Sequence, residues 1–136
     1  MKMKIALQFV KAINQHDVKG ISQLMSNDHQ FIDTWDNIAS KEEMSSGWAG
    51  YFNWFPNYHI EVTEAFENEN SIGLLGYASG SYKGNTKQTW RLPAFWKVVI
   101  GDEKVKIWQV ICDAKIPFDI MNESDKEDVE KLKTNN

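Results

Sequence analysis

Apolar side chains recur at helical intervals through the first third of the chain. The first set lies three or four positions apart between residues 3 and 14 and predicts an amphipathic helix: Ala6, Phe9, Val10 and Ile13. Asp17 then follows a polar break and suits the cap of a second helix, whose apolar face carries Val18, Ile21, Leu24 and Met25. The chain therefore opens with two short helices.

A short strand and a third helix follow. Residues 29–35 alternate, so that Phe31, Asp33 and Trp35 share one face of the predicted strand. The run Ser40-Lys41-Glu42-Glu43 has the form of a capping box and predicts the start of the third helix. The apolar face of that helix carries Met44, Trp48, Tyr51, Phe52 and Phe55, and Pro56 ends it.

Beyond Pro56 the pattern changes to a period of two. Four strands are predicted, over residues 58–67, 71–82, 87–99 and 104–115, and short polar turns separate them. Helices followed by such a meander indicate an α+β fold in which the helices cover one face of a strongly curved antiparallel sheet. We expect this domain to span residues 1–120. We expect residues 121–136 to form a charged tail, a frayed or loosely docked helix to which we assign no chemistry.

Composition limits the class of protein. A chain of 136 residues fits one domain that buries a core without disulfides or a structural metal. Six Trp, four Tyr and seven Phe imply a large core or a large pocket. A net charge of −4, with both signs interspersed, leaves no basic stripe for phosphates, so we expect no nucleic-acid partner.

The single cysteine, Cys112, excludes an internal disulfide and a cysteine-based zinc site. It stands in an apolar run, where a thiol usually behaves as a small hydrophobe. The N-terminus lacks the apolar stretch of a signal peptide, and no segment approaches membrane-spanning length. These features indicate a cytoplasmic protein that does not interact with membranes.

The order of elements resembles the nuclear transport factor 2 superfamily, and its SnoaL-like and ketosteroid-isomerase-like branches most of all. The resemblance covers residues 3–120 and is carried by residues 9–14 and 17–25, by Phe31-Ile32-Asp33, by Phe55-Pro56-Asn57-Tyr58 and by Lys104-Val105-Lys106-Ile107-Trp108. It implies a cone-shaped barrel of helices packed on the curved sheet, with a cavity inside the cone. These motifs specify the fold far better than any reaction.

Matched to that family, the strand over residues 71–82 turns its small residues inward, and the next two strands surround them with aromatic side chains. The resulting ligand-binding set is Trp35, Trp48, Phe52, Gly76, Ala78, Trp90, Ala94, Trp108, Cys112 and Asp113. An apolar cavity would follow. An equally good interpretation is that Gly76 and Gly80 permit bulges and curvature while Trp90 and Trp108 fill the volume.

Asp33 is the candidate catalytic residue. A carboxylate flanked by Phe31 and Trp35 would be desolvated, a condition that suits a general base near neutral pH, and Asp33 matches the position of the base in the ketosteroid isomerase branch. The alternative is a carboxylate that hydrogen-bonds to helix or loop amides near the strand end.

The other catalytic residues that known enzymes of this superfamily use are missing from this sequence. The phenol on the first helix of ketosteroid isomerases matches Phe9, and their protonated acid falls on Ala94 or Phe95, so neither position can donate a hydrogen bond. The epoxide hydrolase relay needs an Arg and an Asp two apart, whereas Arg91, the only arginine, precedes Pro93 by two. Asp113 resembles the terminal Asp of SnoaL-like cyclases or caps the strand exit.

No metal or cofactor is expected. His16, His29 and His59 share no spacing that would bring ligands together, and no glycine-rich loop leads into a helix. His29 could orient Asp33 or lie exposed at the start of its strand. The sequence thus predicts a protein that binds a small apolar molecule, with a cofactor-free isomerase, cyclase or hydrolase-like activity through Asp33; a non-catalytic ligand- or partner-binding domain is the alternative.

A homodimer is expected in either case. Four apolar side chains would face outward from the sheet and need a cover: Tyr77, Phe95, Ile107 and Ile111.

Overall fold

A computed structural model describes the backbone of residues 1–85 and 87–134, and the side chains of this part as far as residue 126. The helices are α1 (Lys2–Asn14), α2 (Val18–Leu24), α3 (Lys41–Trp54) and α4 (Lys115–Thr134), with a 3₁₀ turn η1 (Tyr82–Gly84). The strands are β1 (Met25–Ile32), β2 (Ile38–Ser40), β3 (His59–Glu67), β4 (Ile72–Ser81), β5 (Thr89–Gly101) and β6 (Lys104–Cys112).

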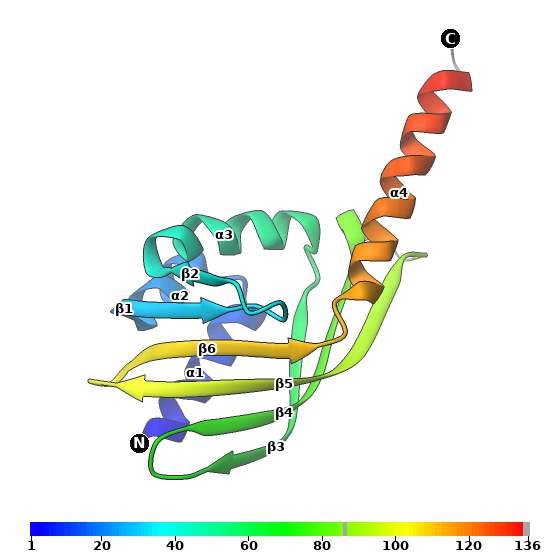
Figure 1. The fold of residues 1–136 in the computed structure, drawn as a ribbon. Coiled ribbons are helices and arrows are strands. Elements are labelled where there is room, and N and C mark those ends of the chain that lie inside the picture. The colour runs from blue at the N-terminus through cyan, green and yellow to red at the C-terminus, as the bar shows by residue number, and fades with distance from the viewer. Residues whose placement is uncertain (86, 135–136) are drawn as a thin grey trace.

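These strands form one curved sheet in the order β2-β1-β6-β5-β4-β3. Figure 1 shows α1, α2 and α3 on one side of the sheet and α4 extending away from it at the C-terminal end. The α+β class and the antiparallel meander of β3 to β6 are confirmed. The sheet is mixed rather than antiparallel, because β1 pairs in parallel with β6, and it stays open at β2 and β3, so it is not a closed barrel.

The core lies between the concave face of the sheet and the first three helices. Its largest fully buried side chains include Phe9 and Ile13 from α1, and Trp96 and Trp108 from the sheet. The helical periodicity of α1 and the alternation of β5 therefore point the predicted residues inward. Ser40 forms the predicted capping box, in which its Oγ accepts from the Glu43 amide at 3.2 Å and its own amide donates to Glu43 Oε1 at 3.2 Å.

Residues 33–37 form a tight turn and do not continue the predicted strand. The Asp33 amide donates to the Asn37 carbonyl oxygen at 3.0 Å, and Asp36 takes a positive φ of 68°. Asp36 and Asn37 are residue types that tolerate such turns. The parallel ladder between β1 and β6 accordingly stops at Ile32, which lies opposite Gln109.

Candidate functional site

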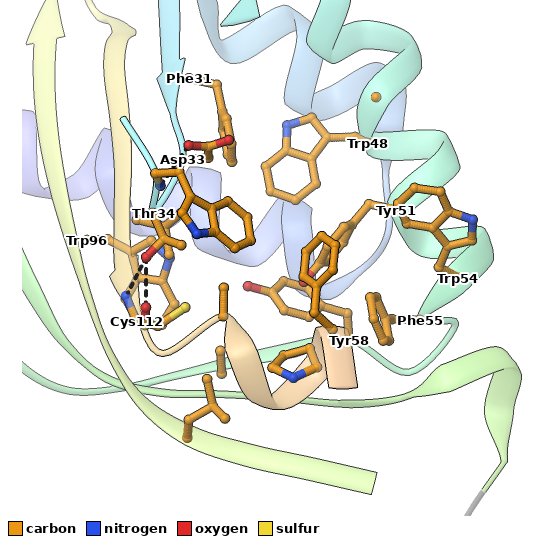
Figure 2. Close-up of a pocket in the computed structure, with 18 of the residues that line it drawn as sticks. Phe31, Asp33, Thr34, Trp48, Tyr51, Trp54, Phe55, Tyr58, Trp96 and Cys112 are labelled. Atoms are coloured by element: carbon orange, nitrogen blue, oxygen red, sulfur yellow. Dashed lines mark hydrogen bonds between the residues drawn. The ribbon is translucent and has the colours of Figure 1, made fainter. Parts of the chain in front are cut away.

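An apolar cavity of about 260 Å³ lies between the concave sheet, α3 and the start of α4. Figure 2 shows α3 contributing Trp48, Tyr51 and Trp54 on one side, with Phe31, Asp33, Thr34 and Cys112 on the other. Among the residues whose side chains the structure describes, the lining consists of Phe31, Asp33, Thr34, Trp35, Met44, Gly47, Trp48, Tyr51, Trp54, Phe55, Tyr58, Ala78, Trp90, Leu92, Trp96, Trp108, Val110, Cys112, Ala114, Pro117, Phe118 and Met121.

Local structure explains this lining. Met44, Trp48, Tyr51 and Phe55 recur at three- and four-residue intervals, so α3 and its cap present them as one stripe toward the sheet. In β5, Trp90, Leu92 and Trp96 stand two or four positions apart and share the concave face. The mainly aromatic face of α3 thus lies opposite the mainly aromatic concave face of β5, and the cavity lies between them.

Two elements meet at the mouth of the cavity. Trp35 in the turn after β1 and Phe118 in the first turn of α4 contact edge to face, with ring centroids 5.1 Å apart. They remain 57% and 47% exposed, so they border the opening rather than fill the core. Thr34 ties the turn to the end of β6, since its Oγ1 donates to the Cys112 carbonyl oxygen at 2.7 Å and accepts from the Cys112 amide at 3.3 Å.

Asp33 lines the cavity, but its carboxylate already has partners within the turn. Oδ1 accepts from the amides of Trp35 and Asn37, both at 2.9 Å, and Oδ2 accepts from Asn37 Nδ2 at 3.1 Å. Both oxygens therefore help to hold the turn. A carboxylate has about four lone-pair positions, so Oδ2 retains capacity to accept from a ligand.

Seven of the residues selected from the sequence lie in the lining: Asp33, Trp35, Trp48, Ala78, Trp90, Trp108 and Cys112. The other four do not, and each has a physical reason. Phe52 points elsewhere on α3, where it stacks on His16 with ring centroids 4.1 Å apart. Asp113 is exposed and accepts a hydrogen bond from the Lys115 amide at 3.1 Å, which caps the start of α4.

The remaining two are on the inner face of the sheet. Ala94 is buried and does not reach the cavity, whereas its larger neighbours on the same face of β5, Leu92 and Trp96, do. A Cβ added to Gly76 would overlap the backbone oxygen of Glu61. Gly76 thus permits the close approach of β3 at its bulge and opens no space in the cavity.

His29 is buried, not exposed, and its Nδ1 donates to the Val105 carbonyl oxygen at 2.7 Å. Burial lowers the pKa of His29, and the Lys41 charge acts in the same direction, against the Val105 hydrogen bond and the Asp28 charge. The imidazole is therefore held neutral in a contact that ties β1 to β6.

Sequence reasoning left Tyr51 and Tyr58 out of the site. Tyr51 stood in the apolar stripe of α3, so the helical period was the signal that could have found it. Tyr58 follows Pro56 outside that helix, where no regular pattern indicates which way its side chain points. Their rings contact edge to face with centroids 4.9 Å apart. Burial raises the pKa of Tyr51 and that of Tyr58 well above the usual tyrosine range, with smaller contributions from neighbouring titratable groups.

The start of α4 was missed as well. Ala114, Pro117, Phe118 and Met121 line the cavity, although none of them was selected as a ligand-binding residue and Met121 falls in the expected tail. The end of the domain that we expected at residue 120 falls within α4, which runs from Lys115 to Thr134. The helix is held by Tyr82 in η1, whose hydroxyl donates to Asp125 Oδ1 at 3.1 Å.

The chemistry available in this lining is narrow. Burial raises the pKa of the Cys112 thiol, as does the nearby Asp113 charge, so the thiol stays protonated near neutral pH. The lining residues that the structure describes include no lysine, arginine or histidine. Within the part of the chain that the structure describes, no group of three or more His, Cys, Asp or Glu could hold a metal ion, and no helix is long and apolar enough to cross a membrane.

Solved structures share this architecture. A protein from Shewanella denitrificans, provisionally assigned as a SnoaL-like polyketide cyclase, is similar with a TM-score of 0.76 and 14% identity over 90% of this chain and 97% of its own. AclR from Streptomyces galilaeus, provisionally assigned as a hydroxylase, has a TM-score of 0.74 and 20% identity. The match covers 90% of this chain and 96% of AclR. A ketosteroid isomerase-like protein from Catenulispora acidiphila, in complex with trimethylamine, has a TM-score of 0.70 and 17% identity. The match covers 78% of this chain and 82% of that protein.

The fold is thus the α+β type of the nuclear transport factor 2-like proteins, with the cavity on the concave side of the sheet. The profile of the SnoaL-like domain matches residues 6–108, and the chain belongs to this family. No curated protein shows significant sequence similarity to the chain.

Proposed function

We propose that this chain binds a small, uncharged and largely apolar ligand in the cavity between α3 and the sheet. The observation that carries the proposal is the cavity itself, about 260 Å³ in volume and lined mainly by aromatic and aliphatic side chains. Small-molecule sites commonly occupy about 300–1,000 Å³, so a compound of one or two rings suits this size. The relatives assigned as a polyketide cyclase and a hydroxylase support a small organic ligand as well.

The binding proposal is tested with the hydrocarbon indane and the fluorescence of Trp48, Trp90 and Trp108 in the wall. Wild type should show a saturable change. Ala78→Leu places additional volume inside the cavity and should weaken binding at least about tenfold, because a filled site excludes the ligand. Ala49→Leu makes the same change at an exposed position of α3 outside the lining and should leave binding unchanged. Absence of a saturable change in wild type would contradict the proposal.

A second candidate function is proton transfer by Asp33. The observation in its favour is that Asp33 lines the cavity and that Oδ2 accepts only one hydrogen bond, from Asn37 Nδ2. A bound ketone carries an acidic C–H beside its carbonyl group, and a carboxylate at that position could accept the proton.

Exchange of deuterium from heavy water into the C2 position of 1-indanone tests this second function by NMR. Wild type should accelerate the exchange, and Asp33→Asn should abolish the acceleration while ketone binding persists, because the amide keeps the shape but cannot accept the proton. Asp113→Asn, at an acid outside the lining, is the matched control. Equal exchange rates with and without wild-type protein would leave ligand binding as the function.

We also propose that the chain forms a homodimer through the outer face of the sheet. Leu75, Phe95 and Ile111 lie directly opposite one another on β4, β5 and β6 and form an apolar row. Leu75 is 38% and Ile111 52% exposed, and Phe66 on β3 is exposed beside the row. The cytoplasmic location expected from the single cysteine stays a prediction.

A further inference from the structure

Two phenol hydroxyls project into this apolar cavity. Tyr51 reaches it from α3 and Tyr58 from the segment that follows, and Figure 2 shows both rings extending toward the centre of the cavity. Among the residues that the structure describes, none forms a hydrogen bond with either hydroxyl. Tyr82, outside the cavity, differs in this respect because its hydroxyl is bonded to Asp125.

Neither hydroxyl is among the buried polar atoms that lack a partner, so both open on the cavity and can bond only to what fills it. A purely hydrocarbon ligand would displace the solvent there and leave both hydroxyls without a hydrogen bond, which is unfavourable. Phenylalanine would fit both positions without that cost. Two adjacent tyrosines in such a wall therefore point to a polar atom on the molecule that occupies the cavity.

The two hydroxyls can act only in their neutral form. Burial raises the pKa of both tyrosines, so both keep their protons at any pH near neutrality. A protonated phenol donates one hydrogen bond, and an sp² oxygen has two lone pairs in its plane. One carbonyl oxygen can therefore accept from Tyr51 and Tyr58 together.

Charge in the lining restricts the ligand further. Among the lining residues with described side chains, a carboxylate ligand would find no lysine, arginine or histidine to balance its charge. Asp33 is the one charged residue of that set. It lies beside Trp35 and the mouth, and three hydrogen bonds within its turn already satisfy much of its acceptor capacity. An uncharged ligand needs no further counter-charge.

We infer that the ligand is an uncharged cyclic ketone or another ring compound with one carbonyl oxygen, bound with that oxygen between the hydroxyls of Tyr51 and Tyr58. Its rings lie against Trp48, Trp90 and Trp108, and its remaining edge faces the mouth. This inference rests on the proposed binding function and names the ligand class for the same cavity.

Three probes on one ring skeleton test it: indane, 1-indanone and protonated 1-aminoindane. Dissociation constants are measured by tryptophan fluorescence and checked by NMR titration. In the double variant Tyr51→Phe with Tyr58→Phe, affinity for 1-indanone should fall about tenfold, since two neutral hydrogen bonds are lost. Affinity for indane should stay within about twofold, because the hydrocarbon accepts no hydrogen bond. Tyr77→Phe, which removes a phenol hydroxyl on β4 outside the lining, should leave the ratio of the two affinities unchanged.

The outcomes separate the inference from the function it rests on. If indane binds and the double variant leaves the affinity ratio of indanone to indane as in wild type, the carbonyl inference is wrong and ligand binding stands. If none of the probes binds, the binding function fails and the inference with it. Tightest binding of 1-aminoindane, lost in Asp33→Asn, would replace the ketone by an ammonium ligand. If the double variant loses its near-ultraviolet circular dichroism and is therefore misfolded, the single variant Tyr51→Phe is measured instead. Its affinity for 1-indanone relative to indane should fall about threefold.

Discussion

Gly76 shows how one residue shapes the sheet without touching the cavity. It lies opposite Val62 at the point where the pairing of β3 and β4 shifts by one residue, and the backbone oxygen of Glu61 occupies the position a side chain would need. A glycine in the middle of a strand often marks such a bulge or a close backbone approach. At Gly80 the corresponding space is bordered by the Trp90 ring at 3.2 Å, so here an aromatic side chain covers the glycine.

Replacement of Gly76 by alanine should therefore destabilise the fold. The new methyl group would overlap the β3 backbone, which cannot move as a flexible side chain can, and we expect a loss of about 1–3 kcal/mol in the free energy of unfolding. Gly50→Ala is the matched control: Gly50 is exposed within α3, an added Cβ would meet nothing within 4 Å, and the helix should gain about 1 kcal/mol. Urea denaturation measures both changes. A stabilised Gly76→Ala protein would show that β3 does not approach so closely.

At the scale of elements, local patterns sufficed where the structure is local. The capping box at Ser40, the helical stripe from Met44 to Phe55 and the alternation of β5 depend on neighbours a few residues apart, and all three were predictable. The parallel pairing of β1 with β6 was not, because it joins segments such as Phe31 and Trp108 that lie far apart in sequence and leaves no local signal.

The residues of the candidate site likewise divide into those that local patterns predict and those that depend on distant contacts. Strand alternation selected the inward tryptophans correctly, but it treated residues 29–35 as one strand and so missed the turn at Asp33. The alternative interpretation, a carboxylate bonded to loop amides near the strand end, describes the bonds that Asp33 accepts from Trp35 and Asn37. The contribution of α4 arises from tertiary packing against Trp35 and η1, to which the charged composition of the segment gives no clue. Residues near the cavity were thus predictable where a regular element carries them, and unpredictable where a turn or a remote helix does.

The whole molecule has two apolar surfaces of the sheet to cover, and the helices cover only the concave one. On the outer face, the row of Leu75, Phe95 and Ile111 crosses three strands and remains partly exposed, as expected for a surface that a second copy covers.

The wild-type chain should accordingly sediment as a dimer at low micromolar concentration. Ile111→Lys places a charge at the most exposed position of that row and should shift the protein to monomers while its thermal unfolding midpoint changes little, since position 111 already faces solvent within one chain. Ile38→Lys introduces the same charge at an equally exposed isoleucine on the edge strand β2 and should leave the dimer intact. Analytical ultracentrifugation across a dilution series decides between the two states. A wild-type monomer throughout, or a dimer that persists in Ile111→Lys, would mean that this face is not where two copies meet.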